Sequence, residues 1–153
     1  MTSRGAFLNK TYNAYAHRKI PGEDIELTHV GPGTPGGEYL RRFWHPVIYM
    51  EELTDVPVAT RILGEDLVVF QDFSGQLGVL EANCPHGGHS LEFGSVCERG
   101  IRCRHGWLID VDGTILEIPG EPGNYPLEDR QFHGAYATHE AAGAVFVYMG
   151  PPD

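Results

Sequence analysis

Short apolar-rich segments recur along the chain beyond residue 46. Short runs rich in Val, Ile, Phe and Tyr are typical of β-strands, and Gly, Asp or Ser between such runs indicates tight turns. The pattern predicts strands over residues 47–50, 58–63, 66–71, 77–81, 107–110, 114–118, 135–139 and 144–149. Turns are expected at Ser74-Gly75, Asp112-Gly113 and Ala142-Gly143. The sequence therefore predicts an all-β fold built from antiparallel hairpins.

The N-terminal part of the chain has a different character. Residues 1–37 show no sustained period and include a Gly- and Pro-rich stretch, so we expect an irregular arm with little structure of its own. A short helix is expected over residues 38–43, because apolar residues fall one helical turn apart there, and Pro46 ends it. We therefore divide the chain into the arm, residues 1–37, and one folded domain, residues 38–153. The large apolar residues expected in its core include Trp44, Phe70, Val145 and Phe146.

Composition and charge narrow the partners and the compartment. The 153 residues include 11 basic and 21 acidic side chains, and the formal net charge of −10 opposes binding to nucleic acid and favours a partner with a basic patch. No apolar run approaches the roughly 20 residues that span a bilayer, and the first ten residues lack the apolar core of a secretory signal. We therefore expect a cytoplasmic protein with no nucleic acid and no membrane partner.

Two segments concentrate the side chains that bind soft metals. Each contains a cysteine and a histidine two residues apart, namely Cys84 and His86 in the first and Cys103 and His105 in the second. Both lie in turn-rich sequence, so we expect both units in loops. Together they supply two thiolates and two imidazoles, the donor set of a tetrahedral zinc site or of a [2Fe–2S] cluster with mixed ligation. Cys97 has no histidine at that spacing and is expected to be an ordinary thiol.

The alternatives imply different chemistry. Zinc has no redox chemistry, whereas a cluster moves single electrons. Replacing two anionic thiolates by neutral imidazoles raises the cluster potential to roughly −150 to +300 mV. The donor pattern by itself leaves the cluster, zinc and a fold that binds no metal all open.

The sequence around the two loops resembles the Rieske [2Fe–2S] domain. The runs C-P-H-G-G and L-E-F-G, then G-I-R-C-R-H-G-W, are similar to the ligand loops of that domain in the α subunits of ring-hydroxylating oxygenases. The resemblance implies a Rieske-type fold, with stacked antiparallel sheets and a cluster-binding tip formed by two loops. It also implies that Cys84 and Cys103 bind one iron, that His86 and His105 bind the other, and that a proline loop over residues 119–122 shields the cluster.

The chain departs from the family pattern at three places. Gly87 stands where the first loop usually has Arg, and His89 is unusual for that loop. The second loop has one residue between Cys103 and His105, where the family has two, typically with an aromatic residue before the histidine. A metal site tolerates errors of only about 0.2 Å in ligand distance, so the short spacing predicts a cluster that is labile, partly occupied or replaced by another metal.

The α subunits of the family carry a mononuclear iron site in a further C-terminal domain. The histidines near the C-terminus of this chain do not support such a site. His133 and His139, with Asp129 or Glu140 as the carboxylate, have the residue types of the facial triad of two histidines and one carboxylate that binds iron. Six residues along a strand separate side chains by roughly 20 Å, which is too far for one metal. We therefore assign no catalytic residue to this chain and expect these histidines to be ordinary core or surface residues.

The leading functional hypothesis is one-electron transfer through a Rieske-type [2Fe–2S] cluster in an aromatic ring-hydroxylating oxygenase system. The resemblance implies a reductase or ferredoxin as electron donor and an oxygenase catalytic domain as acceptor. The alternative from a different class is a non-redox module on the same fold, with zinc or without a cluster.

Overall fold

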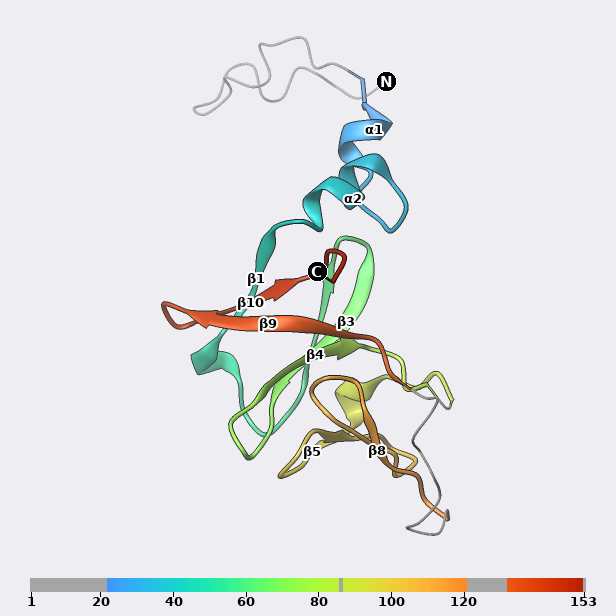
Figure 1. Ribbon diagram of the computed structural model, residues 1–153, viewed down its shortest axis with the longest axis vertical. Coiled ribbons are helices and arrows are strands. Elements are labelled where there is room, and N and C mark those ends of the chain that lie inside the picture. Colours follow the sequence, from blue (N-terminus) through green and yellow to red (C-terminus); the bar gives the residue numbers. More distant parts are fainter. Residues whose placement is uncertain (1–21, 86, 121–131, 153) are drawn as a thin grey trace, which may run out of the picture.

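The computed structural model describes residues 22–85, 87–120 and 132–152, and it shows an all-β domain with two short helices at one end (Figure 1). Six strands form the larger sheet, in the order β1-β10-β9-β4-β3-β2. They are β1 (Trp44–Tyr49), β2 (Val58–Ile62), β3 (Glu65–Gln71), β4 (Leu77–Glu81), β9 (Ala135–Ala141) and β10 (Ala144–Tyr148). The smaller sheet, in the order β5-β6-β7-β8, contains β5 (Ser95–Val96), β6 (Ile101–Arg102), β7 (Leu108–Ile109) and β8 (Ile115–Glu117). The predicted all-β class is confirmed, and every strand pair in the described residues is antiparallel.

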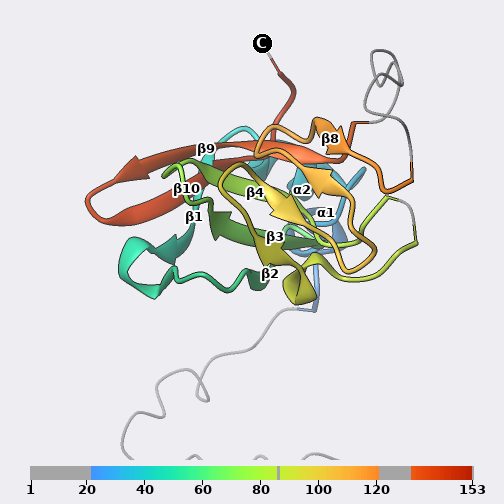
Figure 2. The same cartoon turned by 90° about the horizontal axis from the view of Figure 1, so that it is seen from below.

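The larger sheet consists of two halves joined by a short ladder. Strand β9 pairs with β4 only through Val79 opposite Tyr136 and Leu80 opposite Ala135, whereas β9 and β10 pair over five residues. The halves β1-β10-β9 and β4-β3-β2 therefore share a short hydrogen-bonded edge, and Val147 of β10 packs with Leu67 and Val69 of β3 in one core. With the smaller sheet, which lies across β3 and β4 in Figure 2, they give the stacked antiparallel arrangement that the resemblance implied.

Strand β3 separates two hydrophobic cores. Its side chains alternate between the two faces, as a strand requires, and four consecutive residues are fully buried. Leu67 and Val69 pack on one face with Val79, Val147 and Met149. On the other face, a second cluster fills the space between the larger and the smaller sheet; it includes Val68, Phe70, Leu80, Leu91, Ile101, Ile109 and Ile115.

The predicted turns are confirmed by backbone angles that favour glycine. Gly75, Gly113 and Gly143 have φ values of +90°, +87° and +77° in the turns after β3, β7 and β9. Ala142, which precedes Gly143, is also at positive φ (51°), so both central residues of that turn are left-handed, as a two-residue hairpin requires.

The helices differ from the prediction. Helix α2 (Pro35–Leu40) begins three residues before the expected start, because the Thr34 side chain accepts a hydrogen bond from the Gly37 N–H (3.1 Å) and Pro35 suits the first helical position. It also ends at Leu40 rather than at residue 43. A further helix, α1 (Ile25–Thr28), was not predicted and is capped by Asp24. The arm therefore has more structure than expected from residue 22 onward, and residues 1–21 lie outside the described residues.

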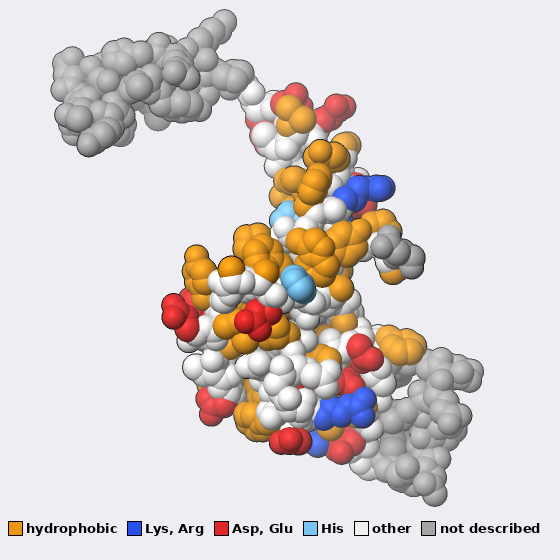
Figure 3. Space-filling view, turned by 60° about the vertical axis from the view of Figure 1, so that its left-hand side comes forward, with side chains coloured by type: hydrophobic (Ala, Val, Ile, Leu, Met, Phe, Trp, Pro, Cys, Tyr) orange, Lys and Arg blue, Asp and Glu red, His pale blue; other side chains and the backbone are white. Residues whose placement is uncertain are grey.

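The expected core is correct for Phe70 and Val145 and wrong for Trp44. Phe70 and Val145 are fully buried, Phe146 is half-buried, and Trp44 is 48% exposed. The reason is that β1 is an edge strand, and Trp44, Phe146 and their partners Tyr148 and His139 share the outer face of β1, β10 and β9. Figure 3 shows hydrophobic side chains gathered on the side of the molecule that carries these strands.

The two α-helices and two 3-10 turns, η2 (Met50–Glu52) and η3 (Leu91–Phe93), are short. Within the described ranges, none has the length and apolar character that crossing a bilayer demands.

Candidate metal centre

The first ligand loop, residues 82–90, connects β4 to η3 and is closed by its own backbone. The N–H of Cys84 donates to the carbonyl of His89 (2.8 Å), and the N–H of Gly88 donates to the carbonyl of Cys84 (2.9 Å). A bridge between Asn83 and Ser90 closes the base of the loop. The loop is therefore a compact turn that fixes the backbone on both sides of Cys84.

The second ligand loop, residues 103–107, connects β6 to β7 and is a tight turn. The Cys103 N–H donates to the carbonyl of Trp107 (2.8 Å), and the Gly106 N–H donates to the carbonyl of Cys103 (2.9 Å). Gly106 has a φ of +91°, which a glycine adopts without strain. The single residue between Cys103 and His105 thus gives a four-residue turn in which His105 occupies the third position.

Burial separates the two kinds of donor. The side chains of Cys84 and Cys103 are 2% and 5% exposed and belong to the core cluster between the sheets, with Phe70 and Leu91. His105 is exposed, and so is His89 from the first loop. The site therefore has buried thiols beneath exposed imidazoles.

The two loops face each other at their outer ends. The imidazole rings of His89 and His105 have centroids 4.7 Å apart and are inclined by 66°. A Cβ atom placed on Gly87 would lie 3.4 Å from Nδ1 of His89 and 3.8 Å from Cε1 of His105. His86 lies outside the described residues. Among the described residues, no group of three His, Cys, Asp or Glu side chains has the arrangement of a finished metal site.

A proline covers the second ligand loop. A Cβ atom on Gly106 would lie only 2.7 Å from Cγ of Pro119, so the backbone of the turn packs directly against that ring. Pro119 is the first residue of the predicted proline loop, and residues 121 and 122 of that loop lie outside the described residues. A side chain at position 106 would displace Pro119, which explains a glycine there on steric as well as conformational grounds.

Asp72 anchors the smaller sheet to the larger one. Its buried carboxylate accepts hydrogen bonds from the Ser74 hydroxyl (2.7 Å) and the Gln76 N–H (2.9 Å) in its own turn, and from the N–H of Gly100 (3.1 Å) between β5 and β6. Burial favours the neutral acid, but these hydrogen bonds outweigh it and lower the pKa of Asp72 below its usual range. The carboxylate therefore holds the strand that leads to Cys103 in place.

Three arginines surround the second ligand loop. Arg99 pairs with the buried carboxylate of Asp110, and Arg102 donates to the carbonyl of Gly106 (2.7 Å) and to Glu117 (2.7 Å). Arg104 is exposed, and no ion pair within the described ranges is found for it. Arg104 therefore places one exposed positive charge beside His105, whereas the charges of Arg99 and Arg102 are balanced by Asp110 and Glu117.

The histidines near the C-terminus have separate structural settings. His133 is buried, and its Nε2 contacts the carbonyl of Glu81 (2.7 Å). His139 is exposed beside Trp44, with which it lines a shallow apolar depression. The two side chains belong to different surroundings, and Asp129 lies outside the described residues.

Sequence reasoning missed the parts of the site that depend on distant contacts. Asp72 is 28 positions from Gly100, and no periodicity connects them. His89 was noticed only as unusual, since its position beside His105 depends on how the two loops fold. The D-F-S-G sequence after β3 is a turn signal, which could have indicated that Asp72 caps its own turn but not that it reaches a second sheet.

Residues 43–132 match the family described as the Rieske [2Fe-2S] domain. The chain is 53% identical to the tert-butanol monooxygenase / tert-amyl alcohol desaturase oxygenase subunit of Aquincola tertiaricarbonis over 146 residues, which cover 93% of this chain and 31% of that protein. It is 49% identical to the phenoxybenzoate dioxygenase subunit alpha of Ectopseudomonas oleovorans over 143 residues, covering 92% and 34%.

A solved structure of similar fold is the reduced complex between oxygenase and ferredoxin in carbazole 1,9a-dioxygenase, with a TM-score of 0.62 and 31% identity over 74% of this chain and 30% of that one. The chain spans about a third of the length of the curated relatives that it matches. The sequence match, the two facing loops and the antiparallel sheets agree, and the chain belongs to the Rieske [2Fe–2S] domain family.

Proposed function

We propose that this chain binds a [2Fe–2S] cluster through Cys84, His86, Cys103 and His105 and transfers single electrons as part of a ring-hydroxylating oxygenase system. The family's cofactor is that cluster. The observation that carries the proposal is the separation of buried thiols from exposed imidazole at two facing loops.

The donor set suits the cofactor chemically. Thiolates are the soft ligands of iron–sulfur clusters, and Cys84 and Cys103 present them from an apolar core, where solvent is excluded. Imidazole on the other iron lowers the negative charge of the site, and His105 holds its ring at the exposed end of the second loop. When bound, the cluster supplies a centre that takes up one electron and gives up one.

The surrounding residues have a supporting part in this proposal. Pro119 packs on the turn that carries Cys103 and His105 and excludes water from its backbone side. Arg102 ties that turn to β8 through Glu117. Such contacts fix ligand direction, and changes in the shell around a metal site typically cost 10–100-fold in metal affinity or activity.

We propose a reductase or ferredoxin as electron donor and an oxygenase catalytic domain as acceptor. The curated relatives are oxygenase subunits about three times as long as this chain, and one similar solved structure is a complex of an oxygenase with ferredoxin. The exposed Arg104 beside His105 gives the donor's acidic side chains a point of contact. The net acidic charge of the chain still favours a partner with a basic patch, and Arg104 is a single positive contact within that surface.

We place this function in the cytoplasm. The thiols of Cys97 and Cys103 form no disulfide, which suits a reducing compartment. We assign no catalytic residue to the chain itself, so that hydroxylation of an aromatic substrate is expected only when an oxygenase catalytic domain is supplied. Product formed in step with NADH use by this chain and a reductase alone would contradict that assignment.

The proposal is tested by reducing the anaerobically prepared protein and recording its electron-spin resonance spectrum. One electron per chain should be taken up, at a potential within roughly −150 to +300 mV, with the signal of a reduced Rieske cluster. The Cys97→Ser variant is the matched control and should behave as the parent does. Zinc without acid-labile sulfide in the parent would overturn the proposal.

A further inference from the structure

We propose that His89 is a second imidazole donor of the first ligand loop, able to occupy the place of His86 beside His105. This inference rests on the proposed function, since it concerns the ligands of the same metal centre. It adds a residue that neither the C-x-H pattern nor the family match assigns.

The spacing of the two rings supports a shared metal. With metal–nitrogen bonds of about 2.0–2.1 Å, two imidazoles on one tetrahedral metal ion have ring centroids roughly 5 Å apart. The rings of His89 and His105 are 4.7 Å apart and inclined by 66° rather than stacked in parallel. Both side chains are exposed, so neither must leave a packed core to turn a nitrogen toward a metal.

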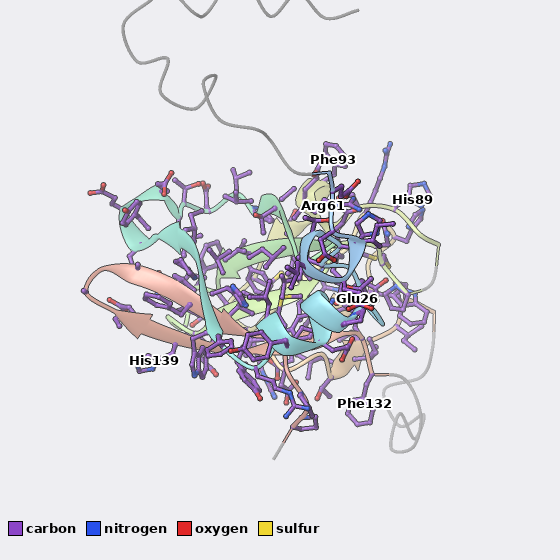
Figure 4. The ribbon with its side chains drawn as sticks, turned by 90° about the horizontal axis from the view of Figure 1, so that it is seen from above. Glu26, Arg61, His89, Phe93, Phe132 and His139 are labelled. Carbon is purple, nitrogen blue, oxygen red and sulfur yellow. The ribbon has the colours of Figure 1, made fainter. Side chains whose placement is uncertain are left out.

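The loop backbone fixes His89 in relation to the thiol ligand. Its carbonyl accepts the N–H of Cys84 (2.8 Å), so His89 closes the turn that presents that cysteine. Figure 4 shows His89 at the edge of the molecule, on the side away from His139. The backbone of His89 is therefore a fixed part of the tip, and its exposed side chain starts from a defined position beside the second loop.

The three departures from the family pattern meet at this point. The second loop is one residue short, which draws His105 into a tight turn. Gly87 leaves open the space beside both rings, where its Cβ would lie 3.4 Å from His89 and 3.8 Å from His105. A long side chain at residue 87 would have to pass next to these rings. The short turn, the absent side chain at residue 87 and the imidazole of His89 therefore lie together, and His89 offers a further donor beside His105.

The test compares His86→Ala, His89→Ala and the double variant in the full chain, each prepared anaerobically and analysed for iron and acid-labile sulfide. Each single variant should retain a cluster, and the double variant should retain none. Pulsed electron-spin resonance on ¹⁵N-histidine-labelled protein should detect two coordinating imidazoles in the parent and in both single variants. His139→Ala, an exposed histidine on the opposite side, is the control and should match the parent.

A second measurement needs no cluster assembly. Apoprotein titrated with Co²⁺ should show thiolate-to-cobalt absorption in the parent and in both single variants. Loss of a group that only supports a ligand lowers metal affinity by roughly 10–100-fold. The double variant loses a ligand itself, so its affinity for Co²⁺ should fall by more than that.

The outcomes separate the two claims. A parent without iron and sulfide would overturn the proposed function and, with it, this inference. A loaded parent whose cluster disappears in His86→Ala, while His89→Ala is unaffected, would overturn the inference alone and leave the proposed function standing.

Discussion

The larger sheet and the ligand-bearing tip are stabilised in different ways. In the larger sheet, β3 and β9 are seven residues long, and β3 contributes four fully buried side chains to two cores. In the tip, β5, β6 and β7 have two residues each, and the connections rather than the strands carry the ligands. The larger sheet is stabilised by long backbone ladders and apolar layers, whereas the tip has short ladders and combines its share of the core between the sheets with Asp72, ion pairs and, in our account, the cluster.

This difference assigns folding and function to separate regions. The larger sheet supplies the face on which Cys84 and Cys103 are buried, and the loops add the chemistry at the exposed end. Loss of the cluster should therefore loosen the tip while the larger sheet persists. The following predictions test that separation.

Replacing either buried thiol should have the largest effect. In Cys84→Ser and in Cys103→Ser we expect loss of the cluster, because a hydroxyl is a poor ligand for iron in this setting. The far-UV circular dichroism should change little. Amide hydrogen exchange should become faster at Ile101 and Ile109 in the tip while Val69 and Val79 in the larger sheet remain protected.

Cys97→Ser is the control for both variants, since Cys97 belongs to neither ligand loop. A uniform loss of amide protection across both sheets would show that tip and larger sheet unfold as one unit.

Truncating Phe70 should destabilise the whole domain. The ring is fully buried in the core between the two sheets and packs against Gly78, where an added Cβ would lie only 2.6 Å from Cζ of Phe70. Phe70→Ala should lower the free energy of unfolding by about 3–5 kcal/mol, measured by urea denaturation. Phe93→Ala, at a side chain that is 72% exposed, is the matched control and should change it by less than about 0.5 kcal/mol.

Removing the charge of Asp72 should weaken the link between the sheets. Asp72→Asn should cost about 1.5–3 kcal/mol, the value of hydrogen bonds to a charged group, and loosen Gly100 more than Val69 in hydrogen exchange. Because the pKa of Asp72 is lowered on folding, its contribution is complete above the unfolded-chain value of 3.8 and disappears as the pH falls through the folded value. The variant should therefore lose less stability than the parent on acidification, and an unchanged acid dependence would contradict this role.

Lengthening the second ligand loop should have the smallest effect on stability and a specific effect on the centre. Inserting Tyr between Arg104 and His105 restores two residues between the ligands at an exposed turn, and in the metal-free protein it should change the free energy of unfolding by less than about 0.5 kcal/mol. Iron occupancy should rise, and the reduced protein should give a stronger Rieske signal. Full occupancy in the parent that falls on insertion would show that the short turn is a working geometry and not a defect.

The same contrast explains what the sequence predicts well. The hairpins of the larger sheet follow from apolar runs separated by turns such as Ala142-Gly143, because long strands that contribute to a core leave such runs in the sequence. Strands β5 and β6 were missed, since two residues cannot show a period. The predicted burial of Trp44 was wrong, because the hydrophobicity of a residue does not reveal that its strand lies at the edge of a sheet.

For the centre, the sequence indicates the donor types but not their arrangement. The repeated Cys and His spacing identifies candidate ligands, because soft metals select those side chains. It does not indicate that Asp72 reaches Gly100, or that His89 lies beside His105, since both contacts depend on the relative placement of separate loops.

The most direct test of the central claim is metal and sulfide analysis of the anaerobically prepared chain, with iron, zinc and acid-labile sulfide measured on one sample. The account predicts iron and labile sulfide in equal amounts, approaching two of each per chain as occupancy rises, with little zinc. One zinc per chain without labile sulfide would contradict it.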